Sequence, residues 1–412
     1  MKKIQVTIVA KSPLAIARQK TGGAISDVES YIPGGVLRGA IAGLMIRQAQ
    51  AEGQDFANDP ESDFKTLFID NQAIFQNAYP ALTDRLELQS DIRVMPSTAL
   101  SSKNSSGFKP DKNGVFDTLI DRFCGDAYDR IYDPNCPTDG DRVDPFKGMY
   151  SVYENQYAIH STSTRMLTRV GINRRRATAE DQVLYSVQVL NETKRHEQEV
   201  CDMTFVGTIW ICDELAISFS QYLEGQRQHC RLGGSASRGL GKVELIPRLM
   251  AFTSDLSDRI QSFNQQLRQR WNQWQIFGNS PSESIEGRCF FTIDLQSDAI
   301  LTEQWQRTTV ISEAMLGAAT GLNLGDLRLH NAYTSAGLRS GWNAAWGLPK
   351  DVELTTDRGS VYLFSIEESA HSAWVSAMEA LEIWGLGDST AEGFGQIRVC
   401  DEFHTVLREN AK

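Results

Sequence analysis

Apolar and polar residues alternate at the start of the chain, where single residues separate Ile4, Val6 and Ile8. This two-residue period predicts a β-strand that ends near Ala10. A different period follows over residues 36–50, where apolar side chains recur every three or four positions. That spacing is typical of an amphipathic helix. The beginning of the chain therefore predicts a strand followed by a helix.

A nine-residue glycine-rich segment occurs twice. Residues 233–241 read GGSASRGLG, and 154 residues later residues 387–395 read GDSTAEGFG. A helical pattern precedes each copy and a β-branched run follows it. The helical patterns cover 213–229 and 371–384, and the β-branched runs cover 242–246 and 396–399. Because both copies share this helix–loop–strand context, we predict two homologous domains.

A third helical pattern, at 255–277, lies between the two copies, and Ser254 is a suitable residue to cap its start. The Gly- and Pro-containing stretch 278–282 breaks this pattern. We therefore divide the chain into an N-terminal domain, a linker and a C-terminal domain. These cover residues 1–250, 251–284 and 285–412, and the first strand of the last is expected at 289–295.

The N-terminal domain is longer than its counterpart. We assign the excess, at about 51–200, to an insertion. Two turn-rich stretches, 96–114 and 133–148, are expected to be mobile loops that project from a compact body.

Composition excludes several classes of protein. Hydrophobic residues make up 41% and charged residues 23% of the 412 residues, which is typical of a soluble globular chain. Lys11 and Pro13 interrupt the apolar start, so it does not fit a secretion signal, and no apolar run approaches the ~20 residues that span a bilayer. With seven cysteines and no export signal, we expect reduced thiols in a cytoplasmic protein with no membrane partner.

Charge is unevenly distributed. The net charge of −11 does not favour nucleic-acid binding by itself. Residues 165–176 nevertheless contain five Arg and no carboxylate, and residues 225–248 contain five cations against the single Glu244. An acidic body with concentrated basic segments suits an anion held in one groove and protein partners around the rest.

The first glycine segment has the composition of a phosphate-binding loop. Its glycines let a ligand approach the backbone, successive N–H groups can cradle a phosphate, and Ser235, Ser237 and Arg238 add donors. A tight connection without a ligand is the alternative. The second copy has Glu392 where the first has Arg238. We therefore expect the first loop, and not the second, to hold an anionic backbone.

Residues 31–39 form a second candidate anion site. Pro33, Gly34 and Gly35 precede the predicted helix, whose free N–H groups lie at its positive end, and Arg38 lies on its first turn. The segment is neither a Walker loop nor a dinucleotide fingerprint, so we expect no ATP, no NAD and no other cofactor.

The arginine-rich stretch leads into the alternating residues 183–190, which predict a strand. An extended arm with arginines at its tip would attract a phosphate backbone. A solvated charged surface is the alternative.

No catalytic or metal-binding constellation stands out. The six histidines are scattered, and Cys124 and Cys136 could bind zinc only with distant ligands such as His160, so we assign no metal site. Asp27 could face a bound phosphodiester, although a lone loop Asp is more often a cap or a solvated charge.

Three segments together resemble the RAMP superfamily of CRISPR-associated proteins. They are IPGGVLRG at 32–39, TRVGINRRRATAEDQVLY at 168–185 and GGSASRGLGKVE at 233–244. With two such domains, the chain is most similar to the Cas five-like subunit of type III-D effector complexes. The resemblance implies an α+β chain of two ferredoxin-like βαββαβ domains, the first carrying a thumb-like arm.

The resemblance also implies a function. The chain would be a non-catalytic subunit that grips the 5′ repeat-derived handle of the crRNA. It would dock the large polymerase-like subunit and the RAMP backbone subunits, and contact target RNA only indirectly. The residues expected to contact RNA are Gly34, Gly35, Arg38, Arg169, Arg174, Arg175, Arg176, Gly233, Gly234, Ser235, Ser237, Arg238, Gly239, Gly241 and Lys242.

Two alternatives remain. A backbone-type RAMP endoribonuclease would cut target RNA with Asp27, and a protein scaffold would not use the arginines for RNA. Processing nucleases of the superfamily use a histidine near the first helix, and residues 31–50 contain none, which argues against guide maturation.

Overall fold

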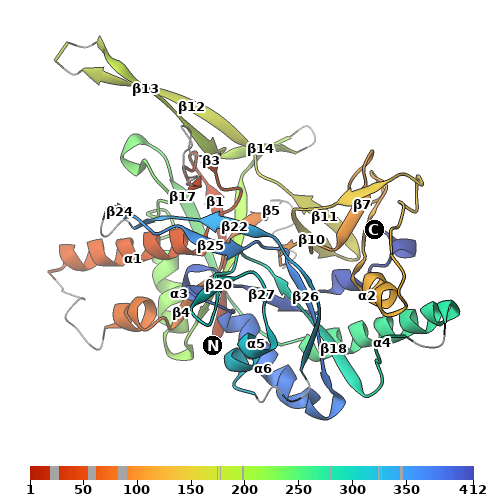
Figure 1. Ribbon diagram of the computed structural model, residues 1–412. Helices are drawn as coiled ribbons and strands as arrows, with labels where there is room; N and C mark the ends of the chain where they lie inside the picture. Colours follow the sequence, from red (N-terminus) through yellow and green to blue (C-terminus); the bar gives the residue numbers. More distant parts are fainter. Residues whose placement is uncertain are drawn as a thin grey trace.

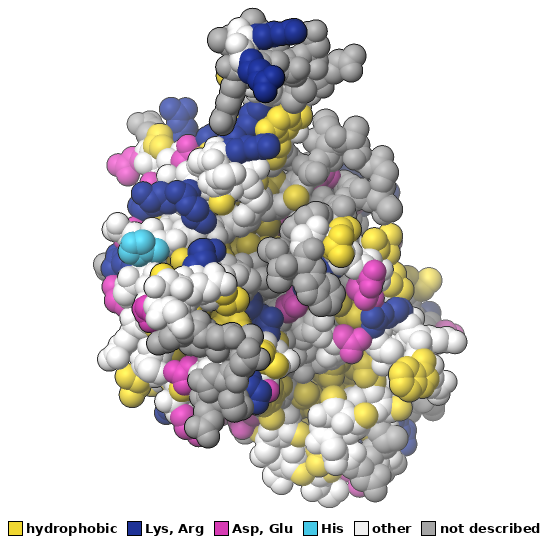
Figure 2. Space-filling view, turned by 90° about the vertical axis from the view of Figure 1, so that its left-hand side faces the viewer, with side chains coloured by type: hydrophobic (Ala, Val, Ile, Leu, Met, Phe, Trp, Pro, Cys, Tyr) yellow, Lys and Arg dark blue, Asp and Glu magenta, His cyan; other side chains and the backbone are white. Residues whose placement is uncertain are grey.

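The structure, a computed structural model, describes residues 1–18, 27–53, 62–81, 91–173, 175–176, 178–196, 199–278, 281–322, 325, 327–343 and 347–412. It mixes α-helices with antiparallel β-sheets, and a two-stranded arm projects from the body (Figures 1 and 2). No helix in the described ranges is both long enough and apolar enough to cross a membrane.

The N-terminal half is built on a sheet in the order β17–β1–β16–β4, and β5 also pairs with β16. Alternate residues of β1 (Ile4, Val6 and Ile8) are fully buried, which confirms the predicted strand. Along the chain the elements run strand, helix, strand, strand, helix, strand. They are β1 (Lys2–Ala10), α1 (Gly34–Ala51), β4 (Ala73–Phe75), β16 (Thr204–Ile211), α3 (Ala216–Gly225) and β17 (Val243–Met250), with β5 at Tyr79–Ala81.

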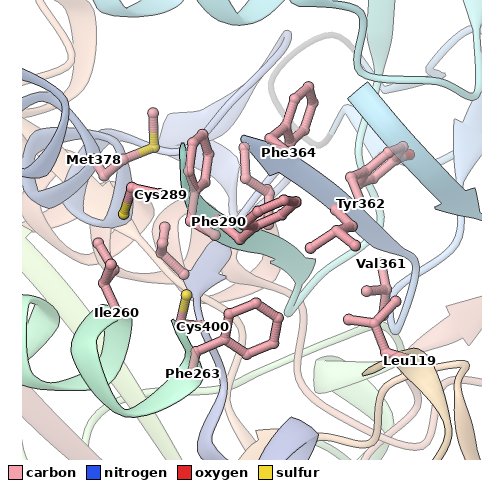
Figure 3. Close-up of a cluster of buried hydrophobic side chains, with 14 of the residues drawn as sticks. Leu119, Ile260, Phe263, Cys289, Phe290, Val361, Tyr362, Phe364, Met378 and Cys400 are labelled. Carbon is pink, nitrogen blue, oxygen red and sulfur yellow. The ribbon is translucent and has the colours of Figure 1, made fainter. Parts of the chain in front are cut away.

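The C-terminal half repeats this arrangement in a sheet of order β21–β26–β18–β27. Numbered along the chain, both sheets have the spatial order fourth, first, third, second. Aromatic residues of β18 and β26, including Phe290 and Phe364, fill its core (Figure 3). The elements are β18 (Arg288–Leu295), α5 (Glu313–Thr320), β21 (Arg328–Tyr333), β26 (Val361–Glu367), α6 (His371–Trp384) and β27 (Ile397–Val399).

The remaining strands form small antiparallel sheets. They are β2 (Ala17–Arg18) with β3 (Asp27–Val28), β6 (Arg93–Val94) with β10 (Met149–Tyr153) and β11 (Gln156–His160), β7 (Ala99–Ser102) with β8 (Val115–Asp117) and β9 (Val143–Pro145), β12 (Thr164–Asn173) with β13 (Thr178–Leu190), β14 (Thr193–His196) with β15 (Glu199–Asp202), β19 (Leu301–Glu303) with β20 (Gln306–Thr308), β22 (Ala336–Arg339) with β25 (Glu353–Thr356), and β23 (Trp342–Asn343) with β24 (Leu348–Pro349). The remaining α-helices are α2 (Leu119–Ala127) and α4 (Leu256–Trp274), and a short π-helix covers Lys65–Ile69.

The two glycine-rich segments have the same backbone. Ser235 and Ser389 both lie in the left-handed region, with φ of 59° and 58°, and a short 3₁₀ turn follows each of them. Each segment then closes onto the residues that flank the first strand of its own half. The matching hydrogen bonds run from Gly241 N to Pro13 O and from Gly395 N to Asp298 O, both 2.9 Å. The internal repeat is therefore a repeat of backbone geometry as well as of sequence.

Much of the expected insertion packs against the C-terminal half. Leu119 and Phe123 of α2 belong to the same buried cluster as Phe290, and the rings of Phe123 and Phe290 lie 5.4 Å apart. Figure 3 shows Leu119 and Phe290 of this cluster. The N–H of Lys412 donates to the Val115 carbonyl at 2.9 Å.

The loop expected at 96–114 is wrong over Ala99–Ser102, because these residues form β7, which is buried and pairs with β8 and β9. Most of residues 103–113 are exposed. The turn residues of this stretch connect packed strands, which local composition does not reveal. Most of 133–148 is exposed, as expected.

Candidate nucleic-acid interface

Strands β12 and β13 form the arm, which is paired from Thr164 opposite Leu190 to Asn173 opposite Thr178. It projects away from the body (Figure 1). Arg175 and Arg176 are exposed at its tip, and Arg174 lies outside the described residues. The predicted arm with arginines at its end is confirmed as a structural element.

A small apolar cluster fixes the base of the arm to the first glycine loop. Leu167 from β12 and Val187 and Val189 from β13 pack with Ala15 and with Leu240 of the loop. Burial of such side chains favours a defined position of the arm. The arm and the loop, far apart in sequence, thus form one surface.

Polar contacts join the same two elements. Arg169 Nη1 donates to the Arg238 carbonyl at 3.1 Å. The Arg238 guanidinium donates to the Tyr185 hydroxyl and lies 5.5 Å from the centre of its ring. Tyr185 is directly opposite Arg169 in the hairpin. The structure therefore brings together two arginines predicted to bind RNA and adds Tyr185, the one aromatic residue in the alternating stretch 183–190.

Backbone amides of the first loop are largely committed within the chain. Each of five N–H groups in this loop donates to a carbonyl oxygen of the protein. They belong to Gly234, Arg238, Gly239, Leu240 and Gly241. These amides cannot cradle a phosphate in this conformation. Side chains can still contact an anion here, because Ser237, Arg238 and Lys242 are exposed.

Gly233, Gly239 and Gly241 have positive φ angles, and so do the corresponding glycines of the second loop. A Cβ on Gly233 would lie 2.5 Å from the Ala15 carbonyl oxygen. Together with the bonded amides, this favours a structural role for the glycines, as in the tight connection considered above.

The predicted anion site at the start of α1 is covered by the second glycine loop. Gly34 N donates to Asn77 Oδ1 at 2.8 Å, and a Cβ on Gly34 would lie 1.8 Å from the Phe75 carbonyl oxygen. A Cβ on Gly35 would lie 3.3 Å from Glu392 Oε2. The anion at this helix end is the protein's own Glu392, a favourable position for a carboxylate. Gly34 and Gly35 therefore contact protein here.

Arg38 also lies against protein. Its guanidinium donates to the Phe68 carbonyl and, at 2.9 Å, to Asn71 Oδ1. Burial lowers its pKa, whereas Glu392 acts in the opposite direction. The structure places Arg38 between α1 and the segment that follows it, apart from the surface formed by the arm and the first loop.

These contacts account for the charge difference between the two loops. Glu392 faces the positive end of α1, whereas Arg238 occupies the same backbone position facing Tyr185 and solvent. A cation in the place of Glu392 would be repelled by the helix end.

An open cleft of about 710 Å³ lies between α1 and the first loop. Exposed Arg47, His229 and Arg231 line it, and none of these was identified from the sequence as a site residue. Helical spacing would have placed Arg47 on the polar side of α1, but the position of that side next to the loop depends on tertiary packing. Figure 2 shows Lys and Arg side chains gathered over the upper part of this face and on the arm.

No protein-family model matches the chain, and no curated protein matches it. Among solved structures, it is similar to a chain of the cryo-EM structure of the Type III-B Cmr-beta bound to cognate target RNA and AMPPnP, with a TM-score of 0.41 and 11% identity over 91% of this chain and 93% of that chain. For the same assembly bound to cognate target RNA, the TM-score is 0.41, with 11% identity over 90% and 94%. For its apo state the TM-score is 0.30, with 14% identity over 60% and 97%.

Asp27 lies near the base of the arm. It is half-buried, pairs opposite Arg18 in the β2–β3 hairpin, and is followed by Val28, whose N–H donates to Gln188 Oε1 of the arm at 3.2 Å. Its position is thus close to the candidate interface.

The residues considered for zinc are separately engaged. Cys124 is buried in the C-terminal core, where burial raises its thiol pKa to about 12, and His160 Nε2 lies 2.8 Å from Ser151 Oγ. Across the described part of the chain, no group of three or more His, Cys, Asp or Glu side chains is placed to hold a metal ion.

Proposed function

We propose that this chain is a non-catalytic crRNA-binding subunit of a type III CRISPR effector complex, most like the Cas five-like subunit of type III-D. Its three RAMP-like sequence segments support this assignment. Each half also has the element order of a ferredoxin-like βαββαβ domain and the matching strand order. The proposed domains are 1–250 and 285–412, joined by 251–284.

One observation carries the RNA-binding role. Arg169 and Arg238 meet Tyr185 on an exposed surface, while Glu392 of the second loop is engaged with α1. Guanidinium groups and an aromatic ring are suited to phosphates and unpaired bases. The first half would therefore hold the 5′ repeat-derived handle.

The second half would support this surface and present protein contacts. The large polymerase-like subunit and the first RAMP backbone subunit are the proposed neighbours, and target RNA would be contacted indirectly through them. No cofactor is needed for this role.

The test is the affinity of the chain for single-stranded guide RNA over a range of salt concentrations. Replacing Arg175, Arg176 and Arg238 with Ala should weaken binding and lower the salt slope by ~0.7 per lost phosphate contact. Replacing the exposed Lys103, Lys112 and Arg142 removes the same charge elsewhere and should change affinity much less. Equal losses in both triple variants, or none in either, would contradict the proposal.

The second candidate function is a target-RNA endoribonuclease, favoured only by the position of Asp27 near the arm. In a reconstituted complex, Asp27→Ala should leave target cleavage unchanged if the chain is not an enzyme. Loss of a single cut site would establish the nuclease.

A further inference from the structure

The cleft between α1 and the first glycine loop combines an apolar floor with basic walls. The α1 residues Gly39, Ala40 and Leu44 line the cleft, and so does Arg47 of the same helix. Arg231, just before the first loop, lines it as well. Within the described chain, its charged lining residues are cations and its one other titratable side chain is the imidazole of His229. A site lined by cations attracts anionic ligands such as phosphates.

Two amides from different helical segments meet at the same cleft. Gln226 Nε2 donates to Gln48 Oε1 at 3.5 Å, a long hydrogen bond at the limit of the usual range. Both side chains line the cleft. An amide can both donate and accept, so this pair could exchange its weak mutual contact for the edge of a nucleobase.

Gly39 is the feature that points to a ligand. It lies inside α1, where glycine is unfavourable relative to alanine. A Cβ built on Gly39 would meet no heavy atom of the protein within 4 Å, so internal packing does not require glycine here. Gly43, one turn further along, would contact Arg47 Nη1 at 3.4 Å. An unsubstituted Gly39 keeps the floor of the cleft open to something outside the chain.

We propose that this cleft receives an unpaired nucleotide of the guide. Its base would lie on the surface of Gly39 and Leu44, and its phosphate would lie near Arg47 and Arg231. Ser237 lines the cleft and precedes Arg238 in the loop, so a strand held by the arm can continue directly into it. This inference rests on the proposed RNA-binding function and adds a site for base recognition.

The decisive variant is Gly39→Ala, because folding and binding should change in opposite directions. Alanine should raise the midpoint of thermal unfolding, and its methyl group should lower affinity for single-stranded guide RNA at least threefold. Gly225→Ala is the matched control, since a Cβ on this glycine of α3 would also meet no heavy atom of the protein within 4 Å and Gly225 does not line the cleft. It should leave RNA affinity unchanged.

A second variant, with Arg47 and Arg231 both replaced by Gln, should lower affinity at least tenfold and reduce crosslinking of 4-thiouridine-labelled guide to α1. Free mononucleotides should not displace labelled guide RNA at the concentrations at which unlabelled guide RNA does, because the arm supplies the rest of the binding surface. Full competition by mononucleotides would instead indicate a free-nucleotide site.

Wild-type affinity in both cleft variants would overturn the inference. If the arm variants also bind normally, or if the unaltered chain does not bind guide RNA, the proposed function fails as well. If only the arm variants lose affinity, the function stands and the cleft assignment alone is wrong.

Discussion

Arg238 and Glu392 occupy equivalent positions in two loops of the same backbone, yet their surroundings differ. Arg238 contacts the arm through Tyr185, whereas Glu392 lies at the start of α1 and forms an ion pair with Lys350. Backbone geometry is thus common to both loops, and the side chain decides what each contacts. This explains why a glycine-rich loop alone does not identify an RNA site.

Reversing each of these charges should show that Glu392 contributes to the stability of the fold, whereas Arg238 contributes to RNA binding. Glu392→Arg places a cation at the positive end of α1 and should lower the free energy of unfolding by about 1–2 kcal/mol. Arg238→Glu should leave stability nearly unchanged and weaken RNA binding strongly. Urea denaturation and RNA titration of both variants provide the measurement. Equal effects of the two substitutions on stability would show that the loops are not distinguished in this way.

At the level of elements, local patterns predicted the regular structure well. The helix expected at 371–384 coincides with α6, and the strand expected at 289–295 differs from β18 by one residue. The helix expected at 213–229 begins as a 3₁₀ turn, and its α-helical part ends earlier, at Gly225. The period of the apolar residues shows which side of a helix or strand is apolar, and this is sufficient to predict the type and approximate bounds of these elements.

Contacts between distant elements could not be predicted in the same way. The burial of α2 against the C-terminal half, the engagement of Arg38 with the segment after α1, and the cleft beside Arg47 all depend on packing across long sequence separations. Arg169 and Arg238 were each predicted to contact RNA, but nothing in the sequence indicated their mutual contact or the part that Tyr185 takes in it.

His404 joins three elements at the centre of this packing. Its ring lies 2.7 Å from Asp294 of β18 and 3.2 Å from Asp117 of β8, and all three side chains are buried. Burial alone lowers its pKa, but the Asp294 and Asp117 carboxylates raise it well above the ordinary value. The C-terminal segment, the expected insertion and the second sheet are therefore held by one charged group.

The sign of this shift gives a pH dependence. Protonated His404 stabilises the folded chain fully at pH values below the pKa of about 6.5 that a histidine has in the unfolded chain. This stabilisation is lost as the pH rises through the higher pKa of His404 in the folded chain. His404→Gln should cost about 3–5 kcal/mol at neutral pH, because two carboxylates lose their buried counter-charge. It should also abolish the alkaline loss of stability. Parallel pH profiles for the two proteins would exclude this role.

At the level of the whole molecule, the two halves are connected by a buried ionic group. Arg339 contacts both Glu29 of the N-terminal half and Asp298 of the C-terminal half, and its side chain is only 10% exposed. The Tyr79 hydroxyl also donates to the Gln296 carbonyl across the same boundary. We therefore expect the halves to unfold together.

Arg339→Ala should destabilise the chain by about 3–5 kcal/mol, since it removes the buried guanidinium that pairs with a carboxylate of each half. It should also separate unfolding into two transitions in calorimetry. Arg408→Ala, at an exposed guanidinium bonded to the Asn135 carbonyl, is the control and should leave a single transition. Two transitions in the unaltered protein would contradict the coupling.

The most direct test of RNA binding by the first half is to crosslink guide RNA to the chain in its reconstituted complex and to map the crosslinked peptides. Crosslinks should fall on 165–176 and 231–242, and the second loop at 387–395 should have none. Crosslinks concentrated on 387–395, with the arm and the first loop unlabelled, would contradict the account.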